Sequence, residues 1–369
     1  MPEIFGNYYS RTDLLRRVGR LEQIAGVRLA TLGDGTERGV RVLEFRTGSG
    51  FVFEVLVDRA FDIGRCEQSG QALGWQSGTG FTGPWYFEPE GLGFMRTWGG
   101  GLLTTVGLDH SFFPATDTTA QYHYPPKQTE QYGLHGRVSN RPARLVGYGE
   151  RWEGDECILW AEGEVLQASA LGERLLLKRR IEARVGQSNL KIHDEVHNIS
   201  YSRTPHMLLY HINFGFPLVD EGAEVLLPIS CQFPPKFSSL DDLTRLDAPT
   251  AAHGGSAFDY EPLCEDSGLS PVGIINRVRQ LGAYELFRPS QLPHALVWRM
   301  LAEGNYVVAL EPSTNRSAGR MDARERGELL ELEPDEQRSY DLELGVLQGE
   351  AALDHFAARV DHLTKAVRA

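Results

Sequence analysis

Cysteine is scarce in this sequence of 369 residues, and an excess of basic residues is absent. The cysteines lie far apart and form no CxxC pair, which argues against a zinc site or a disulfide framework and predicts buried thiols. They are Cys66, Cys157, Cys231 and Cys264. Lys and Arg number 37 against 50 Asp and Glu, so the formal net charge is -13. Nucleic acid and anionic membrane surfaces are therefore not expected as partners.

Long apolar runs are also missing. No uninterrupted stretch approaches the roughly 20 residues needed to cross a bilayer. The first residues, MPEIFGNYYSRTD, lack the apolar core of a secretory signal. We therefore expect a soluble, cytoplasmic protein with no membrane partner.

A phosphate-binding loop is absent as well. The glycine-rich segment Met95–His110 has neither the GxGxxG spacing nor the following lysine of such a loop. Its glycines, Gly99 to Gly101, are expected to allow a bulge or a close approach of two backbones. Trp98 beside them fits either a core residue or a platform for a sugar ring.

What the sequence does contain is alternation of apolar and polar residues. Hydrophobic residues make up 41% of the chain and aromatic residues 10%, enough for a large core. From GVRVLEFRTGSGFVFEVLVDRAFDIG onward the alternation continues for about 300 residues, with turns rich in Gly, Asn and Asp. No fixed-period repeat or linker interrupts it. We therefore expect one large domain, all-β and mainly antiparallel.

Helical spacing is limited to the two ends of the chain. In RTDLLRRVGRLEQIAG, the apolar residues Leu14, Leu15, Val18, Leu21 and Ile24 form a possible short helix face, although Gly19 weakens it. In EAALDHFAARVDHLTKAVRA, the residues Leu353, Phe356, Val360 and Leu363 line one face of a helix. We expect this second helix to pack on the body of the protein.

Polar side chains suited to acid and base chemistry gather at the ends of three probable strands, in YGLHGRVSN, HMLLYHINFG and VVALEPSTN. They are His135, Arg137, Asn140, His206, His211, Asn213 and Glu311. Alternation sets Leu209, His211 and Asn213 on one face of the second strand, and Leu208, Tyr210, Ile212 and Phe214 on the other. The latter face is uniformly apolar or aromatic, so we expect His211 to face a cleft. A structural role for a lone histidine or for Glu311 stays open.

Three other histidines have weaker cases. His206 competes with His211 for a functional role, since it follows Pro205 at the strand entry, but the two face opposite sides of the sheet. His193 and His197 have the i, i+4 spacing of a helical metal pair. Their surroundings, KIHDEVHNIS, alternate as a strand does, which separates them by about 13 Å on one face. We interpret them as solvated and expect no metal site.

Taken together, these segments resemble a known superfamily. His135 in LHGR, His211 in YHINFG and Glu311 after an apolar strand resemble the His, His and Glu of the aldose 1-epimerase (galactose mutarotase-like) superfamily. LVDRAFDIG, GGGLLTTVGL, GLHGRVSN and HMLLYHINFGFP are similar to an aldose 1-epimerase-like bacterial family known mainly as a domain of unknown function. The resemblance implies a β-supersandwich with short N- and C-terminal helices. Residues 1–369 would form a single domain, with its core at 10–345 and its C-terminal helix at 350–368.

The resemblance also implies a catalytic site for a small-molecule sugar. Glu311 would take the proton of the anomeric hydroxyl, His211 would protonate the ring oxygen, and His135 would hydrogen-bond the ring oxygen or a neighbouring hydroxyl. A base and an acid that act near neutral pH suit this chemistry, since a cleft can raise the pKa of a carboxylate. The chemistry implied needs no metal or cofactor.

Substrate-binding candidates are Arg137, Arg59, Asn213 and His206. Arg137 stands where familiar mutarotases have the second glycine of His-Gly-Gly, and a guanidinium suits vicinal hydroxyls or an acidic group. Arg59 could instead pair with Asp62. The aspartate that holds sugar hydroxyls in mutarotases has three candidates here, Asp58, Asp62 and Asp109. Another sugar epimerisation or isomerisation, a carbohydrate-binding protein without turnover, and a homo-oligomer stay open.

Overall fold

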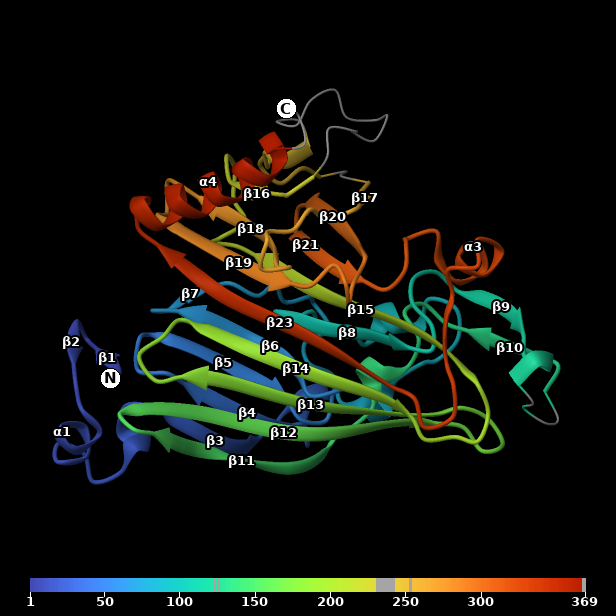
Figure 1. Ribbon diagram of the computed structural model, residues 1–369, viewed down its shortest axis with the longest axis horizontal. Helices are drawn as coiled ribbons and strands as arrows, with labels where there is room; N and C mark the ends of the chain where they lie inside the picture. Colours follow the sequence, from blue (N-terminus) through green and yellow to red (C-terminus); the bar gives the residue numbers. More distant parts are fainter. Residues whose placement is uncertain (123, 125–126, 230–242, 252–253, 367–369) are drawn as a thin grey trace.

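Two large β-sheets lie face to face in the computed structural model, which describes residues 1–122, 124, 127–229, 243–251 and 254–366 (Figure 1). Every ladder between the named strands in this part of the chain is antiparallel. The prediction of a mainly antiparallel all-β protein is confirmed.

The first sheet has eight strands in the order β11 (Arg144–Glu153), β12 (Glu156–Ala168), β13 (Arg174–Arg184), β14 (Asn189–Asn198), β23 (Gln337–Gln348), β19 (Leu281–Phe287), β18 (Ser270–Asn276) and β16 (Glu224–Leu226). The second has eleven, in the order β17 (Ser256–Tyr260), β20 (His294–Ala302), β21 (Asn305–Ser313), β15 (Thr204–Gly215), β8 (Leu103–Leu108), β6 (Asp62–Gln68), β5 (Phe51–Leu56), β4 (Arg41–Arg46) and β3 (Gly26–Thr31). Two short strands complete it, β22 (Leu330–Leu332) beside β15 and β7 (Gln71–Ala72) beside β6.

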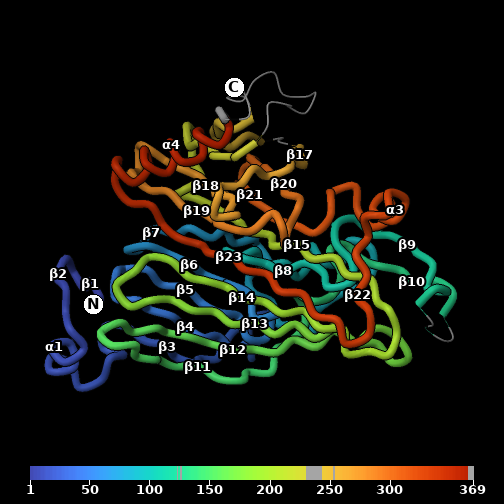
Figure 2. Tube along the Cα trace, in the orientation of Figure 1, coloured from blue at the N-terminus to red at the C-terminus, as the bar shows by residue number. Residues whose placement is uncertain are grey.

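Two small hairpins lie outside the sheets, β1 (Glu3–Ile4) with β2 (Asn7–Tyr8) and β9 (Ala115–Thr118) with β10 (Thr129–Tyr132). The helix α3 (Gly319–Glu325) lies beside the β9–β10 hairpin at one end of the molecule (Figure 1 and Figure 2). An ion pair fixes this contact, because Arg320 of α3 donates to Asp117 of β9 at 2.6 Å. None of the helices in the described part of the chain combines the length and the apolar character needed to cross a membrane.

The two predicted terminal helices differ in outcome. α1 (Arg11–Leu15) begins after Ser10, whose hydroxyl accepts a hydrogen bond from the backbone of Asp13. The prediction that the helix could extend to Ile24 is wrong, because α1 ends at Leu15 and only a 3-10 turn at Leu21–Gln23 follows. α4 (Glu350–Ala366) is confirmed, and it packs on β18 and β23 with Leu353, Phe356 and Val360 buried.

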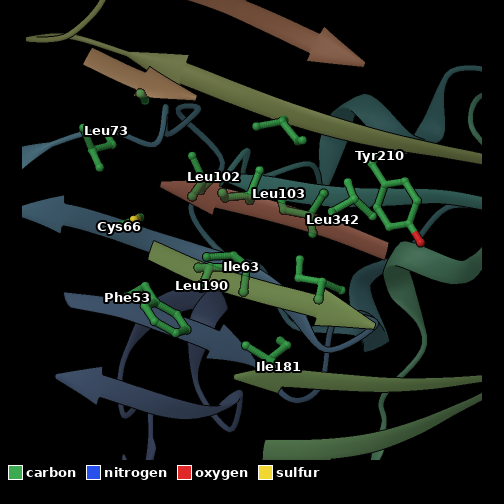
Figure 3. Packing of buried hydrophobic residues seen from close by; sticks show 14 of the residues in the cluster. Phe53, Ile63, Cys66, Leu73, Leu102, Leu103, Ile181, Leu190, Tyr210 and Leu342 are labelled. Atoms are coloured by element: carbon green, nitrogen blue, oxygen red, sulfur yellow. The ribbon is translucent and has the colours of Figure 1, made fainter. Parts of the chain in front are cut away.

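The main hydrophobic core fills the space between the sheets (Figure 3). Strand β15 contributes Leu208, Tyr210, Ile212 and Phe214 to it. Leu209 instead joins a separate cluster on the other face of the same sheet. The predicted division of this strand into a core face and an opposite face is therefore confirmed. Of the cysteines, Cys66 and Cys157 are buried as predicted, Cys264 is exposed, and Cys231 lies outside the described residues.

A charged network joins the sheets through this core. Arg179 of β13 donates to both carboxylate oxygens of Asp194 on β14, at 2.8 and 2.6 Å, and to Asp62 on β6 at 2.8 Å. The hydroxyl of Tyr210 donates to Asp194 at 2.7 Å. Burial of these charges is tolerated because each is paired and hydrogen-bonded. Asp62 thus serves the core and is not placed to hold a sugar.

Candidate functional site

His211 and Glu311 meet on the face of the eleven-stranded sheet that points away from the other sheet. His211 comes from β15 and Glu311 from the neighbouring strand β21. On β21, Val308 and Leu310 enter the main core, so Glu311 faces the opposite side. The His211 Nε2 and Glu311 Oε1 atoms are 3.4 Å apart, and their side chains are only 5% and 1% exposed. Two residues far apart in the sequence are therefore adjacent in one buried site.

His135 joins this pair from a loop. Its ring lies edge-on to that of His211, with centroids 5.8 Å apart. The loop is held by backbone bonds, since the His135 N–H donates to the carbonyl of Phe112 and its carbonyl accepts from Gly107. His135 has a φ of 61°, a left-handed conformation, and Gly136 follows with a φ of 70°. The tight turn aims the imidazole at β15.

Aromatic side chains enclose the three polar residues. The ring centroids of Trp98 and Trp298 lie 4.9 and 5.7 Å from that of His211. The ring centroid of Phe94 lies 5.0 Å from that of His135. The Trp98 indole N–H donates to the Thr104 hydroxyl at 3.0 Å, which fixes the ring. The site thus has apolar walls of the kind that pack against the C–H faces of a sugar.

The glycines beside Trp98 have the role that their spacing predicts. A Cβ at Gly99 would lie 2.3 Å from the carbonyl oxygen of Gly80, and one at Gly101 would lie 2.5 Å from that of Ile63. Backbones therefore approach too closely there for any side chain. Trp75 packs on Trp98, while Trp85 is exposed on the surface.

The environment of the pair holds both groups in their neutral forms. Burial raises the pKa of Glu311 well above its usual range, and the charge of Asp259 adds to this effect. Burial lowers the pKa of His211 to about 3. The pKa of His135 is also well below its usual value, because of burial and the neighbouring His211 and His110. Burial therefore favours a pair in which Glu311 carries the proton and His211 is neutral.

Three polar atoms at the centre of the site have no hydrogen-bond partner among the described residues. They are Nδ1 of His135, Nδ1 of His211 and Oε1 of Glu311. Buried polar atoms normally have a partner, so these atoms are suited to bind hydroxyl groups of a ligand. The cluster has a possible acid, a possible base and a further hydrogen-bonding group.

Two other predicted residues of β15 support the fold around the site. The Asn213 side-chain amide donates to the carbonyl oxygens of Gly101 and His211, at 3.0 and 2.9 Å. His206 lies on the core face, where its Nδ1 donates to the carbonyl of Leu108 and its Nε2 contacts the Tyr340 hydroxyl, each at 2.8 Å. The structure does not bring His206 to the site, because its ring bridges the two sheets.

Neither predicted arginine contacts the three central residues. Arg59 is buried and donates to the carbonyl of Thr82, and burial lowers its pKa to about 10. Arg137 contacts Glu173 and lies 3.9 Å from Asp109, beside a separate pocket. Arg137 thus pairs with acidic side chains, which is a structural role and not the predicted contact with a substrate in the His211 site.

The other aspartates and histidines considered from the sequence have partners away from His211 and Glu311. Asp58 pairs with Arg41 at 2.6 Å, and Asp109 accepts from Gln167 at 2.6 Å. His193 and His197 have different partners on the outer side of β14, Asp341 and Asp335, each at 2.7 Å. Within the described ranges, no group of three or more His, Cys, Asp or Glu side chains is placed to hold a metal ion.

Sequence reasoning missed Trp298 and Phe94 as walls of the site. A signal for Trp298 was present, because β20 pairs with β21 and sets Trp298 opposite Ala309, two residues before Glu311. Residues two apart on a strand share a face. Phe94 had no such signal, since it comes from a 3-10 turn at Gly93–Arg96.

Solved structures with the same fold include aldose 1-epimerase and galactose mutarotase-like proteins. A "putative aldose 1-epimerase" from Klebsiella pneumoniae superposes with a TM-score of 0.81 at 22% identity, covering 92% of this chain and 87% of that chain. A galactose mutarotase-like protein from Clostridium acetobutylicum gives 0.61 at 13% identity, with 87% and 98% covered. A galactose 1-epimerase from Lactobacillus acidophilus gives 0.53 at 11% identity, with 88% and 99% covered. The chain therefore has the galactose mutarotase-like fold.

The sequence defines the family more narrowly. Residues 37–346 match the model of a family described as a domain of unknown function, DUF4432, and the chain belongs to this family. No curated protein matches the chain in sequence.

Proposed function

We propose that the protein is an aldose 1-epimerase-like enzyme that interconverts the anomers of a sugar by general acid and base catalysis. The observation that carries this proposal is the buried contact between His211 and Glu311, with His135 beside them and apolar walls around them. The fold of the neighbouring structures agrees with it.

Ring opening needs two proton transfers. A base takes the proton of the anomeric hydroxyl, an acid gives a proton to the ring oxygen, and the bond between the anomeric carbon and the ring oxygen breaks as the carbonyl forms. Glu311 is the proposed base and His211 the proposed acid. After the aldehyde group turns, the same groups return both protons and close the ring. The reaction consumes no proton overall.

The resting position of the proton adds a detail to this cycle. In the free site Glu311 carries the proton and His211 is neutral, because burial disfavours both charges. This arrangement suits the open-chain sugar, where Glu311 donates to the carbonyl oxygen and His211 accepts from the hydroxyl. Opening a cyclic sugar needs the reverse arrangement. The proton must then move across the 3.4 Å contact as sugar hydroxyls bind to the Glu311 carboxylate.

His135 is proposed to position the substrate. Its Nδ1 has no hydrogen-bond partner among the described residues, so it can bond the ring oxygen or an adjacent hydroxyl. Trp98 and Trp298 would pack on the C–H face of the ring. Arg59 and Asn213 are proposed to act on the shape of the site through the backbones that they hold.

Exchange spectroscopy on free hexoses, pentoses and deoxysugars tests this function. Faster exchange between α and β signals of one sugar than in buffer alone supports the proposal. Appearance of a different sugar indicates an isomerase or an epimerase at another carbon instead. Line broadening without exchange or conversion indicates a binding protein.

A further inference from the structure

A second pocket, of about 590 Å³, lies next to the site of His211 and Glu311. Its lining comes from residues 89–91, 114–116, 130–133 and 136–137, together with Asp109. The volume is within the range of small-molecule sites, roughly 300–1,000 Å³. His135, His211 and Glu311 are not part of its lining, so the pocket is distinct from the site that these three residues form.

The pocket and the cluster of His135, His211 and Glu311 lie on either side of one loop. In the loop at 133–137, the His135 ring contacts Phe94 and His211, while Gly136 and Arg137 line the second pocket. The segment at 89–91 forms the adjacent wall, and it is tied to the loop because the Leu134 N–H donates to the carbonyl of Gly91 at 2.8 Å. A ligand in the second pocket would therefore contact the other side of the loop that holds His135.

The polar groups of the pocket suit hydroxyls better than charges. Arg137 contacts Glu173 and lies 3.9 Å from Asp109, so its charge is already compensated. Glu90 adds negative charge to the lining, whereas Glu130 is paired with Lys127, so the described residues of the lining include no unpaired cation that would favour an acidic ligand. A carboxylate and a guanidinium side by side offer acceptors and a planar set of donors, the combination that vicinal hydroxyls require.

Stacking contributes little to recognition in this pocket. The ring of Tyr132 is packed against His110, with centroids 4.9 Å apart, and the Arg320 guanidinium lies 4.3 Å from its centroid. These neighbours cover the ring. Recognition therefore depends on hydrogen bonds that Asp109 accepts and Arg137 donates.

We propose that this pocket is a second binding site for a neutral, hydroxyl-rich ligand, a sugar or a linear polyol, which Asp109 and Arg137 hold. The inference stands independently of the proposed catalysis, because its residues and its ligand chemistry come from the second pocket alone.

A pair of variants on β10 tests this site. Gln131 and Thr129 are both exposed and lie two residues apart, so they share a face of the strand, but only Gln131 lines the pocket. Gln131→Trp should obstruct the pocket, and Thr129→Trp is the matched control. The probe is a linear hexitol, titrated into the full-length protein while backbone amide signals of residues 130–137 are followed by NMR.

The hexitol should shift these signals, and Gln131→Trp should weaken its binding at least ~10-fold while Thr129→Trp leaves it unchanged. Arg137→Lys keeps the charge but loses the planar donor set, and should also weaken binding several-fold. Glucuronate and glucosamine serve as charged comparators. Absence of a shift at 130–137, equal binding by Gln131→Trp, or a response to a charged comparator alone would overturn the proposal.

Discussion

His206 and His211 lie on one strand and face opposite sides of it. The alternation of β15 allowed the correct face to be predicted for His211, because apolar side chains define the core side. It did not show what His206 contacts. The partner of His206, Tyr340, comes from a distant strand in the other sheet, and no local pattern encodes that contact.

Substituting each histidine by asparagine should separate the two roles. His211→Asn should lower turnover ~100-fold, the usual scale for losing an acid or base group, and leave the unfolding free energy nearly unchanged. His206→Asn should lower the unfolding free energy by about 1–3 kcal/mol, since a buried bridge between the sheets is lost. Its turnover should stay close to normal. The reverse pattern in anomer exchange and urea unfolding would show that His206 is the acting residue.

The lowered pKa of His211 also leads to a prediction for the pH dependence of the rate. The pair works with one shared proton, which rests on Glu311 in the free site and moves to His211 for ring opening. The pKa of His211 is lowered to about 3, so the pair takes up a second proton only near that pH. Protonation of His211 should therefore lower kcat/KM by less than about twofold as the pH falls from 7 to 5. A fall centred near pH 6.5 would mean that His211 titrates as an ordinary histidine.

At the scale of elements, the loop of residues 133–137 positions His135 and also lines the second pocket through Gly136 and Arg137. Gly136 has a φ of 70°, and a Cβ there would lie 2.6 Å from the carbonyl oxygens of Gly107 and His110. Gly91 has a φ of 54°, but a Cβ there would meet nothing within 4 Å. Both glycines therefore have a left-handed backbone conformation, but only Gly136 lacks the space for a Cβ.

Alanine at each position should expose that difference. Gly91→Ala should lower the unfolding free energy by about 1 kcal/mol, the cost of a left-handed alanine. Gly136→Ala should cost about 1–3 kcal/mol more and should also slow anomer exchange, because the backbone of His135 must shift. Equal unfolding midpoints and equal exchange rates for the two variants would refute a rigid loop.

Sequence reasoning was strong for elements with an apolar stripe and weak elsewhere. Strand β15 and helix α4 were predicted because their buried residues recur at regular spacing. Helix α3 was missed. Its largest buried side chain is Arg320, which is compensated by Asp117 of the β9–β10 hairpin, so the helix lacks an apolar face that a periodicity search could find.

At the scale of the molecule, Arg179 joins the two sheets by pairing with Asp194 of one and Asp62 of the other. Its side chain is 0% exposed, whereas that of Arg180, the next residue, is 28% exposed and pairs with glutamates on the outer surface. The two adjacent arginines thus allow buried ion pairs to be compared with surface ion pairs on the same strand.

Arg179→Met should lower the unfolding free energy by about 3–5 kcal/mol, because it leaves two buried carboxylates without a cation. Arg180→Met should cost less than about 1 kcal/mol, as expected for a surface pair. Urea unfolding monitored by tryptophan fluorescence measures both. Similar small losses would show that the buried network contributes little to joining the sheets.

The whole site could be predicted only in part. The resemblance grouped His135, His211 and Glu311 from three distant segments, and the structure places them within one cluster. The contacts of Arg137 could not be predicted, because Glu173 lies in the turn between β12 and β13 and meets Arg137 only when the sheets pack. A charged residue such as Arg137 can therefore be assigned to substrate recognition only when the residue that pairs with it is known.

The anomer exchange rate of a responsive sugar, measured with the native protein and with Glu311→Gln, tests the central claim most directly. The amide keeps the size of the side chain, but it cannot carry the shared proton, so exchange should slow at least ~100-fold while fold and sugar affinity stay nearly intact. Near-normal exchange by Glu311→Gln, or no acceleration of any sugar by the native protein, would contradict the proposed catalytic pair.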